Sequence, residues 1–257
     1  MRLTRWTTTP SSVSWPDVTI IIAHRGASAY APENTLKAFS LAADMHAEMS
    51  ELDVILTADG RLVVFHDDTT GRWEAVDHDV RAVTNTHMQT LDIGGEKVPL
   101  LSEVLDLARN RGMRLNVELK HAGAAAPVLA AIADTNMQDG VIISSFVPLA
   151  LHEVRALDAR IPLAYLMGSQ SWNLLVRARE FWPMAALKQY GCQAWHPYRA
   201  LPGVDFSIAQ VRSAGYAVNV WTVNDEAEMR RFAQIPVDGI ITDRPDVART
   251  ILKEMHP

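Results

Sequence analysis

The sequence predicts an α/β fold, a TIM (β/α)8 barrel with a small insertion after the second strand. Three observations predict this fold: the chain has 257 residues, β-rich runs alternate with helical patterns from residue 19 onward, and there are eight such runs. A (β/α)8 domain has about 250 residues, and this alternation is typical of a parallel sheet covered by helices. A doubly wound sheet is the alternative. It needs fewer strands and usually has a glycine-rich first turn, where this chain has His24-Arg25-Gly26.

The strands are predicted from short β-branched and apolar runs bounded by turn residues. They span Thr19–His24, Ser50–Ile55, Arg114–Lys120, Val141–Phe146, Pro162–Met167, Gln193–His196, Ala217–Val223 and Asp238–Thr242. The first helix is indicated by Leu36, Phe39 and Ala43 at helical spacing, and Ser102 and Gly112 are the expected ends of the second. Helices are predicted near 102–111 and at 126–137, 148–158, 172–190, 205–214, 225–234 and 245–255.

The chain divides into a leader and one domain. Residues 1–18 are rich in Thr, Ser, Pro and Trp and show no apolar period, so they are predicted to be an N-terminal leader. The barrel domain is predicted at 19–257, with the insertion at 57–98. Long irregular loops are uncommon unless they are functional, and in these barrels they lie at the catalytic end.

The insertion is predicted to begin with an antiparallel strand. Leu62–His66 reads as a strand but follows Ser50–Ile55 too closely for a parallel crossover. Asp59-Gly60 between them is a hairpin signal. With Asp59-Gly60 at the centre of the turn, Asp53 is expected to lie opposite His66.

Composition excludes several classes of function. The net charge of −6 gives no electrostatic footprint for nucleic acid or for an anionic membrane. The apolar run Ile20–Ala23 is far too short to span a membrane, and no secretory signal is visible, so stable membrane anchoring is not expected and a cytoplasmic location is predicted. The single cysteine, Cys192, excludes a disulfide framework. The oligomeric state stays open.

Three acidic side chains are predicted to face the barrel interior. Glu51 and Asp53 are two residues apart on one strand and share a face, as Glu118 and Lys120 do on the next. The residues between them are apolar and are expected to face the helices. Ionised groups are not buried without partners, and a divalent cation could hold all three carboxylates; oxygen ligands suit Mg²⁺ or Ca²⁺. A salt-bridge cluster neutralised by Lys120 or Arg25 is the alternative.

Histidines and cations lie beside these acids. His24 ends the first strand, and the hairpin places His66 next to Asp53. A pair of histidines can release a proton on one side of a reaction and accept one on the other. Arg25 and Lys120 favour an anionic substrate that bears phosphate, and ion pairing with the acids is the alternative.

Two further residues are candidate substrate contacts. Glu33 precedes Asn34 and Thr35, either of which could cap the first helix, and it lies in a loop at the catalytic end. Trp221 ends the seventh strand and is either a core residue or a wall of the substrate site. His196, which ends the sixth strand, is the one remaining histidine that could reach the site.

An ordered set of short motifs covers the chain from about residue 19 to 250. Together, this set resembles the glycerophosphodiester phosphodiesterases, in the short form that looks cytosolic and bacterial. The motifs are His24-Arg25-Gly26, Ala31-Pro32-Glu33-Asn34-Thr35, Glu51-Leu52-Asp53, His66-Asp67, Val117-Glu118-Leu119-Lys120, Val220-Trp221-Thr222-Val223-Asn224 and Asp238-Gly239-Ile240-Ile241-Thr242-Asp243.

The resemblance implies a TIM barrel with an insertion after the second strand. It also implies hydrolysis of small-molecule glycerophosphodiesters, such as glycerophosphocholine, to sn-glycerol 3-phosphate and an alcohol. The roles it implies are Glu51, Asp53 and Glu118 for one Mg²⁺ or Ca²⁺, His24 and His66 for acid–base catalysis, and Arg25 and Lys120 for the phosphate.

Some alternatives remain open at this stage. The sequence does not decide which histidine is the base, or whether a glycerol hydroxyl or water attacks phosphorus. The insertion carries an uncommon set of residues, Trp73, His78 and His87, which affects the head-group preference. A lysophospholipase D activity would need an apolar groove, for which Trp73 and Met88 are candidates. A barrel that binds a phosphate ligand without turnover is the non-enzymatic alternative.

Overall fold

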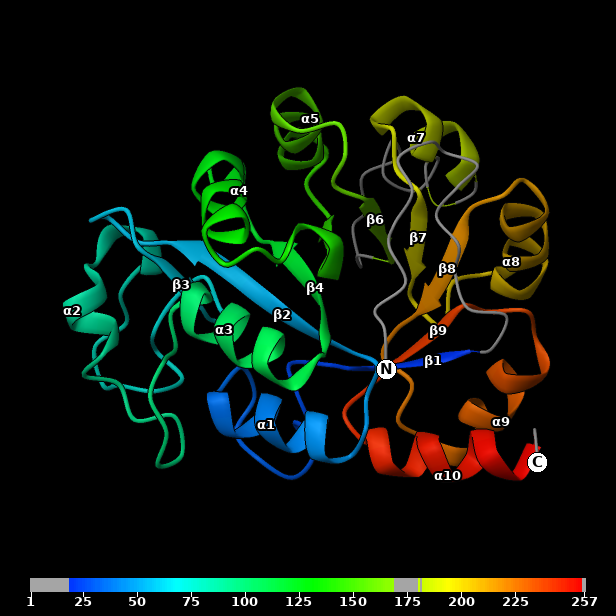
Figure 1. Cartoon of the computed structure of the whole chain (residues 1–257), viewed down its shortest axis with the longest axis horizontal. Coiled ribbons are helices and arrows are strands. Elements are labelled where there is room, and N and C mark those ends of the chain that lie inside the picture. Colours follow the sequence, from blue (N-terminus) through cyan, green and yellow to red (C-terminus); the bar gives the residue numbers. More distant parts are fainter. Residues whose placement is uncertain (1–18, 169–179, 181, 256–257) are drawn as a thin grey trace.

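The computed structural model describes residues 19–168, 180 and 182–255. The parallel strands are β1 (Ile20–Ala23), β2 (Met49–Leu56), β4 (Arg114–Leu119), β5 (Val141–Ser145), β6 (Leu163–Met167), β7 (Ala194–Pro197), β8 (Ala217–Val220) and β9 (Gly239–Thr242). Within the described residues these eight strands follow the order β1-β9-β8-β7-β6-β5-β4-β2, and pairing of β1 with β2 closes the barrel (Figure 1). The predicted TIM-barrel fold is confirmed.

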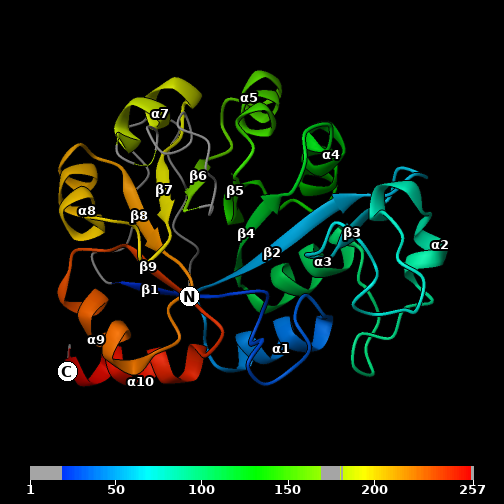
Figure 2. The same ribbon diagram turned by 180° about the vertical axis from the view of Figure 1, so that it is seen from behind.

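Helices follow the strands and cover the outside of the barrel in both views (Figures 1 and 2). They are α1 (Leu36–Asp44), α3 (Leu101–Arg111), α4 (Ala125–Asp134), α5 (Pro148–Leu157), α7 (Pro183–Tyr190), α8 (Val204–Ser213), α9 (Glu226–Gln234) and α10 (Pro245–Met255). The predicted leader at 1–18 and most of the first half of the helix predicted at 172–190 lie outside the described residues. None of the helices in the described ranges has the length and apolar character needed to cross a membrane.

The side chains of β2 point alternately into the barrel and towards the helices, as the sequence predicts. Met49 belongs to the apolar cluster inside the barrel. Glu51 and Asp53 follow it on the same face, because side chains two residues apart on a strand point to the same side. Leu52 and Val54 belong to the larger cluster between strands and helices. The inner face of β2 therefore changes from apolar to acidic towards the carboxyl end of the strand.

The insertion begins with β3 (Leu62–Val64), which pairs antiparallel with β2 as predicted. The predicted register is wrong by one residue. Val54 lies opposite Val64, and Asp53 therefore faces position 65, whose amide donates to the Asp53 carbonyl at 3.0 Å. His66 follows the last residue of β3, so strand alternation does not fix the direction of its side chain.

The turn explains the register error. The amide of Thr57 donates to the carbonyl of Arg61 at 2.9 Å, which leaves a three-residue loop in which Gly60 has φ +75°. The prediction assumed a two-residue turn. The rest of the insertion includes the short helices η1 (Val80–Ala82) and α2 (Asn85–Met88). It packs around an apolar cluster of its own: Ile55, Val63, Phe65, Val80, Met88, Leu91, Ile93 and Val98.

The start of α3 also differs from the prediction. The helix begins at Leu101, and the predicted N-cap, Ser102, lies inside its first turn. Leu101 is fully buried, so packing against the core fixes the start of the helix. The carboxylate of Glu103 accepts from the amide of Leu100 at 2.7 Å and satisfies the exposed helix terminus. Gly112 ends the helix with φ +64°, as predicted.

Gly26 allows α1 to approach the loop that follows β1. Its φ is +80°, and a Cβ at this position would lie 2.6 Å from the carbonyl carbon of Ala38. We expect Gly26→Ala to lower the free energy of unfolding by ~1–3 kcal/mol, because it adds backbone strain to a steric clash. The shift in the urea midpoint measures this loss. The matched control is Gly60→Ala, where φ is +75° but the space is open; equal losses would show that the contact with α1 contributes nothing.

Candidate active site

A cavity of about 180 Å³ opens at the carboxyl ends of the barrel strands. His24 follows β1, Lys120 follows β4 and Trp221 follows β8, which places the cavity at the end where TIM barrels carry their active sites. Asp53 and Glu33, which are not among its lining residues, both pair with Arg25. The lining residues are His24, Arg25, Glu51, His66, Asn116, Glu118, Lys120, Phe146, Leu166, Trp221 and Ile241.

The three predicted metal ligands come together as the alternation requires. Asp53 and Glu118 are direct neighbours across β2 and β4. One carboxylate oxygen from each of Glu51, Asp53 and Glu118 lies within 4.8 Å of the other two, and all three residues are buried. Burial, and then the charges of Asp53 and Glu118, raise the pKa of Glu51 well above its usual value. Burial and Asp53 raise the pKa of Glu118 to about 7.

Two cationic side chains neutralise only part of this charge. The Lys120 ammonium lies 3.3 Å from Asp53 Oδ1 and 3.1 Å from Glu118 Oε1, and Arg25 Nε lies 3.2 Å from Asp53 Oδ2. Burial would raise the pKa of Asp53, but the charges of Lys120 and Arg25 outweigh it and lower the pKa to about 2. Across the part of the chain that the structure describes, Lys and Arg side chains form no ion pair with Glu51, which accepts the Arg25 amide at 3.0 Å. A plain salt-bridge cluster, the alternative considered above, therefore explains how the charge of Asp53 is tolerated, but among the described residues it offers no ion-pair partner for the carboxylate of Glu51.

This arrangement fits a divalent cation. The donor set is three carboxylates without nitrogen or sulfur, which suits Mg²⁺ or Ca²⁺. A cation among the three oxygens would also remove the mutual repulsion that raises the pKa of Glu51 and Glu118.

Asn34 supports the carboxylate of Asp53. Its side-chain amide donates to Asp53 Oδ2 at 2.9 Å, and its side-chain carbonyl accepts the Asp53 amide at 3.4 Å. The backbone of Asn34 has φ +58°, a conformation that asparagine tolerates better than most residues. The cap of α1 is Thr35, whose hydroxyl accepts the Ala38 amide at 3.2 Å. Asn34 was predicted from the sequence only as a possible cap, and its contact with Asp53 was missed.

His24 is held by an aspartate from the other end of the chain. Its Nδ1 lies 2.6 Å from Asp243 Oδ1. Ser28 and Asn224 donate to the same carboxylate at 3.0 and 2.6 Å. Burial would raise the pKa of Asp243, but these hydrogen bonds and the charge of His24 lower it. With Nδ1 engaged in this way, Nε2 is the nitrogen left for proton exchange.

His66 is held in a similar manner. Its Nδ1 lies 2.7 Å from Asp67 Oδ1, and Arg72 Nε lies 2.8 Å from Asp67 Oδ2. Burial lowers the pKa of His66, although the charge of Asp53 acts in the opposite direction. Neither Asp67 nor Asp243 was predicted to be the partner of a histidine. The adjacency of His66 and Asp67 in the sequence was the only available signal.

The two remaining candidates occupy different places. Glu33 accepts from Arg25 Nη1 at 3.1 Å and also from Arg72. Trp221 packs edge to face on Phe146, with ring centroids 5.4 Å apart and an angle of 82° between the rings. Its indole nitrogen donates to the carbonyl of His196 at 2.9 Å. Trp221 therefore forms an aromatic side of the cavity together with Phe146, a residue that was not predicted to lie there.

His196 lies in the barrel core and is not among the lining residues of the cavity. Its side chain is fully buried, and its Nε2 lies 2.9 Å from the amide nitrogen of Asn219. Burial lowers the pKa of His196 to about 3. This histidine is therefore neutral at ordinary pH, and the suggestion that it reaches the site is wrong.

The raised pKa of Glu118 predicts how the metal-free chain responds to pH. The folded state keeps a proton on Glu118 up to a pKa of about 7, whereas the ordinary value for a glutamate is 4.5. Between these values the folded state holds more protons, so its stability falls as pH rises. The opposite shift of Asp53 acts only below the ordinary aspartate value of 3.8. We expect the melting temperature in chelator to fall by several degrees between about pH 4.5 and 7, since ~1 kcal/mol shifts it by ~2–4 °C.

The control for this measurement is Glu118→Gln, which removes one titrating group and should make the slope smaller; the raised pKa of Glu51 contributes a slope of the same sign. Added Mg²⁺ should flatten it as well, because the ion favours the ionised carboxylates. Equal slopes for the parent chain and Glu118→Gln would show that Glu118 does not titrate in this window.

The fold and the cavity define the class of this protein as a TIM-barrel enzyme. Its site joins an oxygen-ligand cluster for a divalent cation to a pair of histidines suited to proton transfer. A family model described as the glycerophosphoryl diester phosphodiesterase family matches residues 24–247. The chain belongs to this family, which confirms the predicted family and the predicted enzyme class.

Individual relatives are similar over nearly the whole chain. A glycerophosphodiester phosphodiesterase of Caldanaerobacter subterraneus is 32% identical over 92% of this chain and 98% of its own. The crystal structure of a glycerophosphodiester phosphodiesterase from Parabacteroides distasonis matches with a TM-score of 0.81 and 28% identity, covering 94% of this chain and 99% of that one. An Oleispira antarctica phosphodiesterase, solved with the product sn-glycerol-3-phosphate, matches with a TM-score of 0.78 and 28% identity over 92% and 97%.

Proposed function

We propose that this chain hydrolyses glycerophosphodiesters to sn-glycerol 3-phosphate and an alcohol, using a divalent cation and two histidines. The observation that carries the proposal is the carboxylate cluster of Glu51, Asp53 and Glu118, which meets His24 and His66 at one cavity. Membership of the family supports the reaction, and the product bound to the Oleispira antarctica protein supports the substrate class.

Glu51, Asp53 and Glu118 would hold one Mg²⁺ or Ca²⁺. The bound cation supplies positive charge that stabilises negative charge on the phosphate and lowers the pKa of a nearby hydroxyl. Arg25 and Lys120 line the same cavity and would bind the phosphate oxygens. Phe146 and Trp221 form the aromatic side of the cavity, which suits the carbon skeleton of the glycerol or of the head group.

The two histidines would divide the proton transfers. Burial lowers the pKa of His66, so this side chain is neutral near pH 7 and suited to accept a proton as the base. His24 would then be the acid, and its Nδ1 is held by the Asp243 carboxylate at 2.6 Å. In each case the aspartate holds Nδ1, which leaves Nε2 to exchange the proton.

The reaction then proceeds in two steps. A glycerol hydroxyl oxygen attacks phosphorus and loses its proton to His66, while the bond from phosphorus to the alcohol breaks and His24 protonates the departing oxygen. Water opens the resulting cyclic phosphate with the two roles reversed. Direct attack by water, with His66 accepting its proton, is the alternative route to the same products.

The test is release of glycerol 3-phosphate from glycerophosphocholine by the purified chain in Mg²⁺, followed with a coupled dehydrogenase assay. We expect steady turnover, and an absence of glycerol 3-phosphate would leave only a barrel that binds phosphate ligands. Lysophosphatidylcholine should be a much poorer substrate. Of the two residues predicted for an acyl groove, Met88 is fully buried in the core of the insertion, and Trp73 lines a pocket of only about 10 Å³. Equal rates on the two substrates would favour a lysophospholipase D.

Arg25, Lys120, Glu33 and Trp221 remain predicted substrate contacts, and the choice between Mg²⁺ and Ca²⁺ stays open. The cytoplasmic location, the leader and the expectation of neither nucleic-acid nor membrane partners also stay predictions from the sequence.

A further inference from the structure

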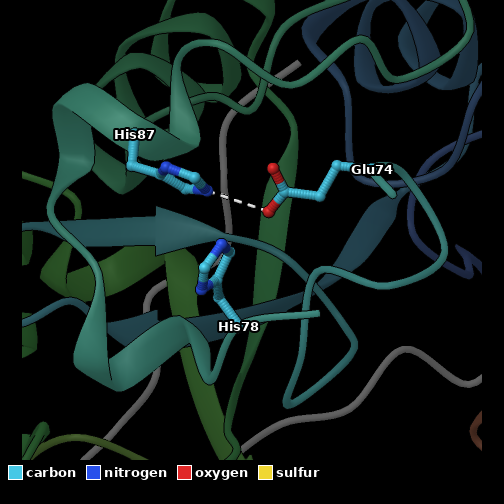
Figure 3. Close-up of side chains that lie close together, drawn as sticks. All are labelled: Glu74, His78 and His87. Carbon is cyan, nitrogen blue, oxygen red and sulfur yellow. Dashed lines mark hydrogen bonds and ion pairs between the residues drawn. The ribbon is translucent and has the colours of Figure 1, made fainter. Parts of the chain in front are cut away.

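A second group of metal-type side chains lies in the insertion, outside the cavity. Glu74, His78 and His87 are directed towards one another (Figure 3). Each offers one ligand atom, and these atoms all lie within 4.8 Å of one another. His87 Nε2 lies 2.8 Å from Glu74 Oε1. The rings of His78 and His87 meet edge to face, with centroids 5.0 Å apart.

We propose that Glu74, His78 and His87 bind a zinc ion, at a site separate from the carboxylate cluster in the barrel. Two imidazoles and one carboxylate are a ligand set that Zn²⁺ takes readily, with water in the fourth position. Mg²⁺ and Ca²⁺ prefer oxygen ligands. The two groups in this chain therefore differ in chemistry, with oxygen ligands in the barrel and mainly nitrogen ligands in the insertion.

Threonine hydroxyls hold the backbone and side chains of these ligands. Thr70 is fully buried, and its hydroxyl accepts the His78 amide at 3.0 Å. Hydrogen bonds from Thr70 and from His87 hold the carboxylate of Glu74. The hydroxyl of Thr84 accepts the His87 amide at 3.4 Å at the start of α2. Partners of this kind orient metal ligands and strengthen binding.

The distances require only a small closure. Tetrahedral ligands with bonds of about 2.0–2.1 Å are about 3.3 Å apart, whereas the three atoms here lie within 4.8 Å. We expect rotation of the three side chains to close this gap. The hydrogen bond between His87 Nε2 and Glu74 would be replaced on binding, because a nitrogen bound to a metal carries no proton.

A bound ion would link three positions of the insertion that are separated in sequence. Glu74 and His78 lie before η1, and His87 lies in α2. Glu74 is two residues from Arg72, which pairs with Asp67 beside His66. A bound ion would thus order the segment that supports one of the proposed catalytic histidines.

The experiment is equilibrium dialysis of the whole chain against Zn²⁺, in excess Mg²⁺ to fill the carboxylate cluster, with bound zinc counted by mass spectrometry. We expect one tightly bound Zn²⁺ for each chain. His78→Ala should weaken binding by at least ~10-fold. This variant is the informative one, because it removes a proposed ligand and leaves the hydrogen bond between His87 and Glu74 in place. The control is His152→Ala, an exposed residue of α5, which should bind zinc like the parent chain.

Two further measurements distinguish zinc binding in the insertion from a folding defect of the variant and from zinc binding at the barrel cluster. Co²⁺ bound to the parent chain should give the strong visible absorption of a tetrahedral site, and this needs no variant. Asp53→Asn should keep the zinc of the insertion although it alters the barrel cluster. The proposal fails if the parent chain retains no zinc, if His78→Ala binds it equally well, or if Asp53→Asn abolishes it. In each of those cases Glu74 and His87 form only a hydrogen-bonded pair.

Discussion

His24→Ala and His66→Ala are each expected to lower kcat for glycerophosphocholine by ~10²–10⁴-fold, the usual contribution of a general acid or base. Both variants should stay folded, because these side chains line the cavity and are 19% and 32% exposed. Steady-state release of glycerol 3-phosphate measures the loss, and the melting temperature checks the fold. Near-normal turnover by either variant would remove that histidine from the mechanism.

The matched control is His121→Ala. His121 also pairs with an aspartate, since its Nε2 lies 2.9 Å from Asp68 Oδ1, but it is not among the lining residues of the cavity. We expect its turnover to stay near that of the parent chain. If His121→Ala lost as much turnover as His24→Ala, loss of a histidine–aspartate pair near the cavity, and not loss of proton transfer, would be enough to explain the fall in kcat.

A substrate with an activated leaving group distinguishes the acid from the base. A p-nitrophenyl ester of glycerol 3-phosphate has a leaving group that departs without a proton, so the acid becomes unnecessary. If His24 is the acid of the first step, His24→Ala should recover most of its rate of p-nitrophenol release in the first turnover, and His66→Ala should not. Recovery by His66→Ala alone would reverse the assignment.

Chelation is expected to abolish turnover, and Mg²⁺ or Ca²⁺ should restore it. The physical reason is the set of buried carboxylates, Glu51, Asp53 and Glu118, which two cationic side chains neutralise only in part. Activity after dialysis against EDTA, with each ion then added back, measures the dependence. Full activity in excess chelator would exclude a catalytic cation.

EDTA would also remove an ion from the insertion, so the experiment needs a variant that lacks that site. His78→Ala provides it. If the barrel cluster alone supports turnover, Mg²⁺ should restore activity to chelated His78→Ala as fully as to the parent chain. Recovery in the parent chain that requires Zn²⁺ in addition would show that the two groups of ligands act together.

Local patterns predicted the parts of the site that lie on strands. The positions of Glu51, Asp53 and Glu118 follow from a side-chain period of two and from the pairing of neighbouring strands. The partners of the histidines could not be found in this way. Asp243 contacts His24 across 219 positions of sequence, a contact that exists only because β9 closes the barrel against β1. Short-range periodicity carries no information on such a pair.

The errors have equally local causes. The register of β3 depended on the assumed length of a turn, and a loop of three residues instead of two moves every pair by one position. Ser102 has the chemistry of a helix cap, but burial of Leu101 sets where the helix begins. In both cases tertiary packing or turn geometry outweighed the preference of a single residue.

Arg72 limits how freely the insertion could be exchanged between homologous enzymes. It pairs with Asp67 beside His66 and with Glu33 beside Arg25, so one guanidinium contacts the supports of both the proposed proton acceptor and the arginine predicted to bind phosphate. A graft that replaced the insertion to change the head-group preference would have to bring an equivalent of Arg72. Without one, the chimera would lose rate on every substrate, and selectivity could not be redesigned independently of turnover.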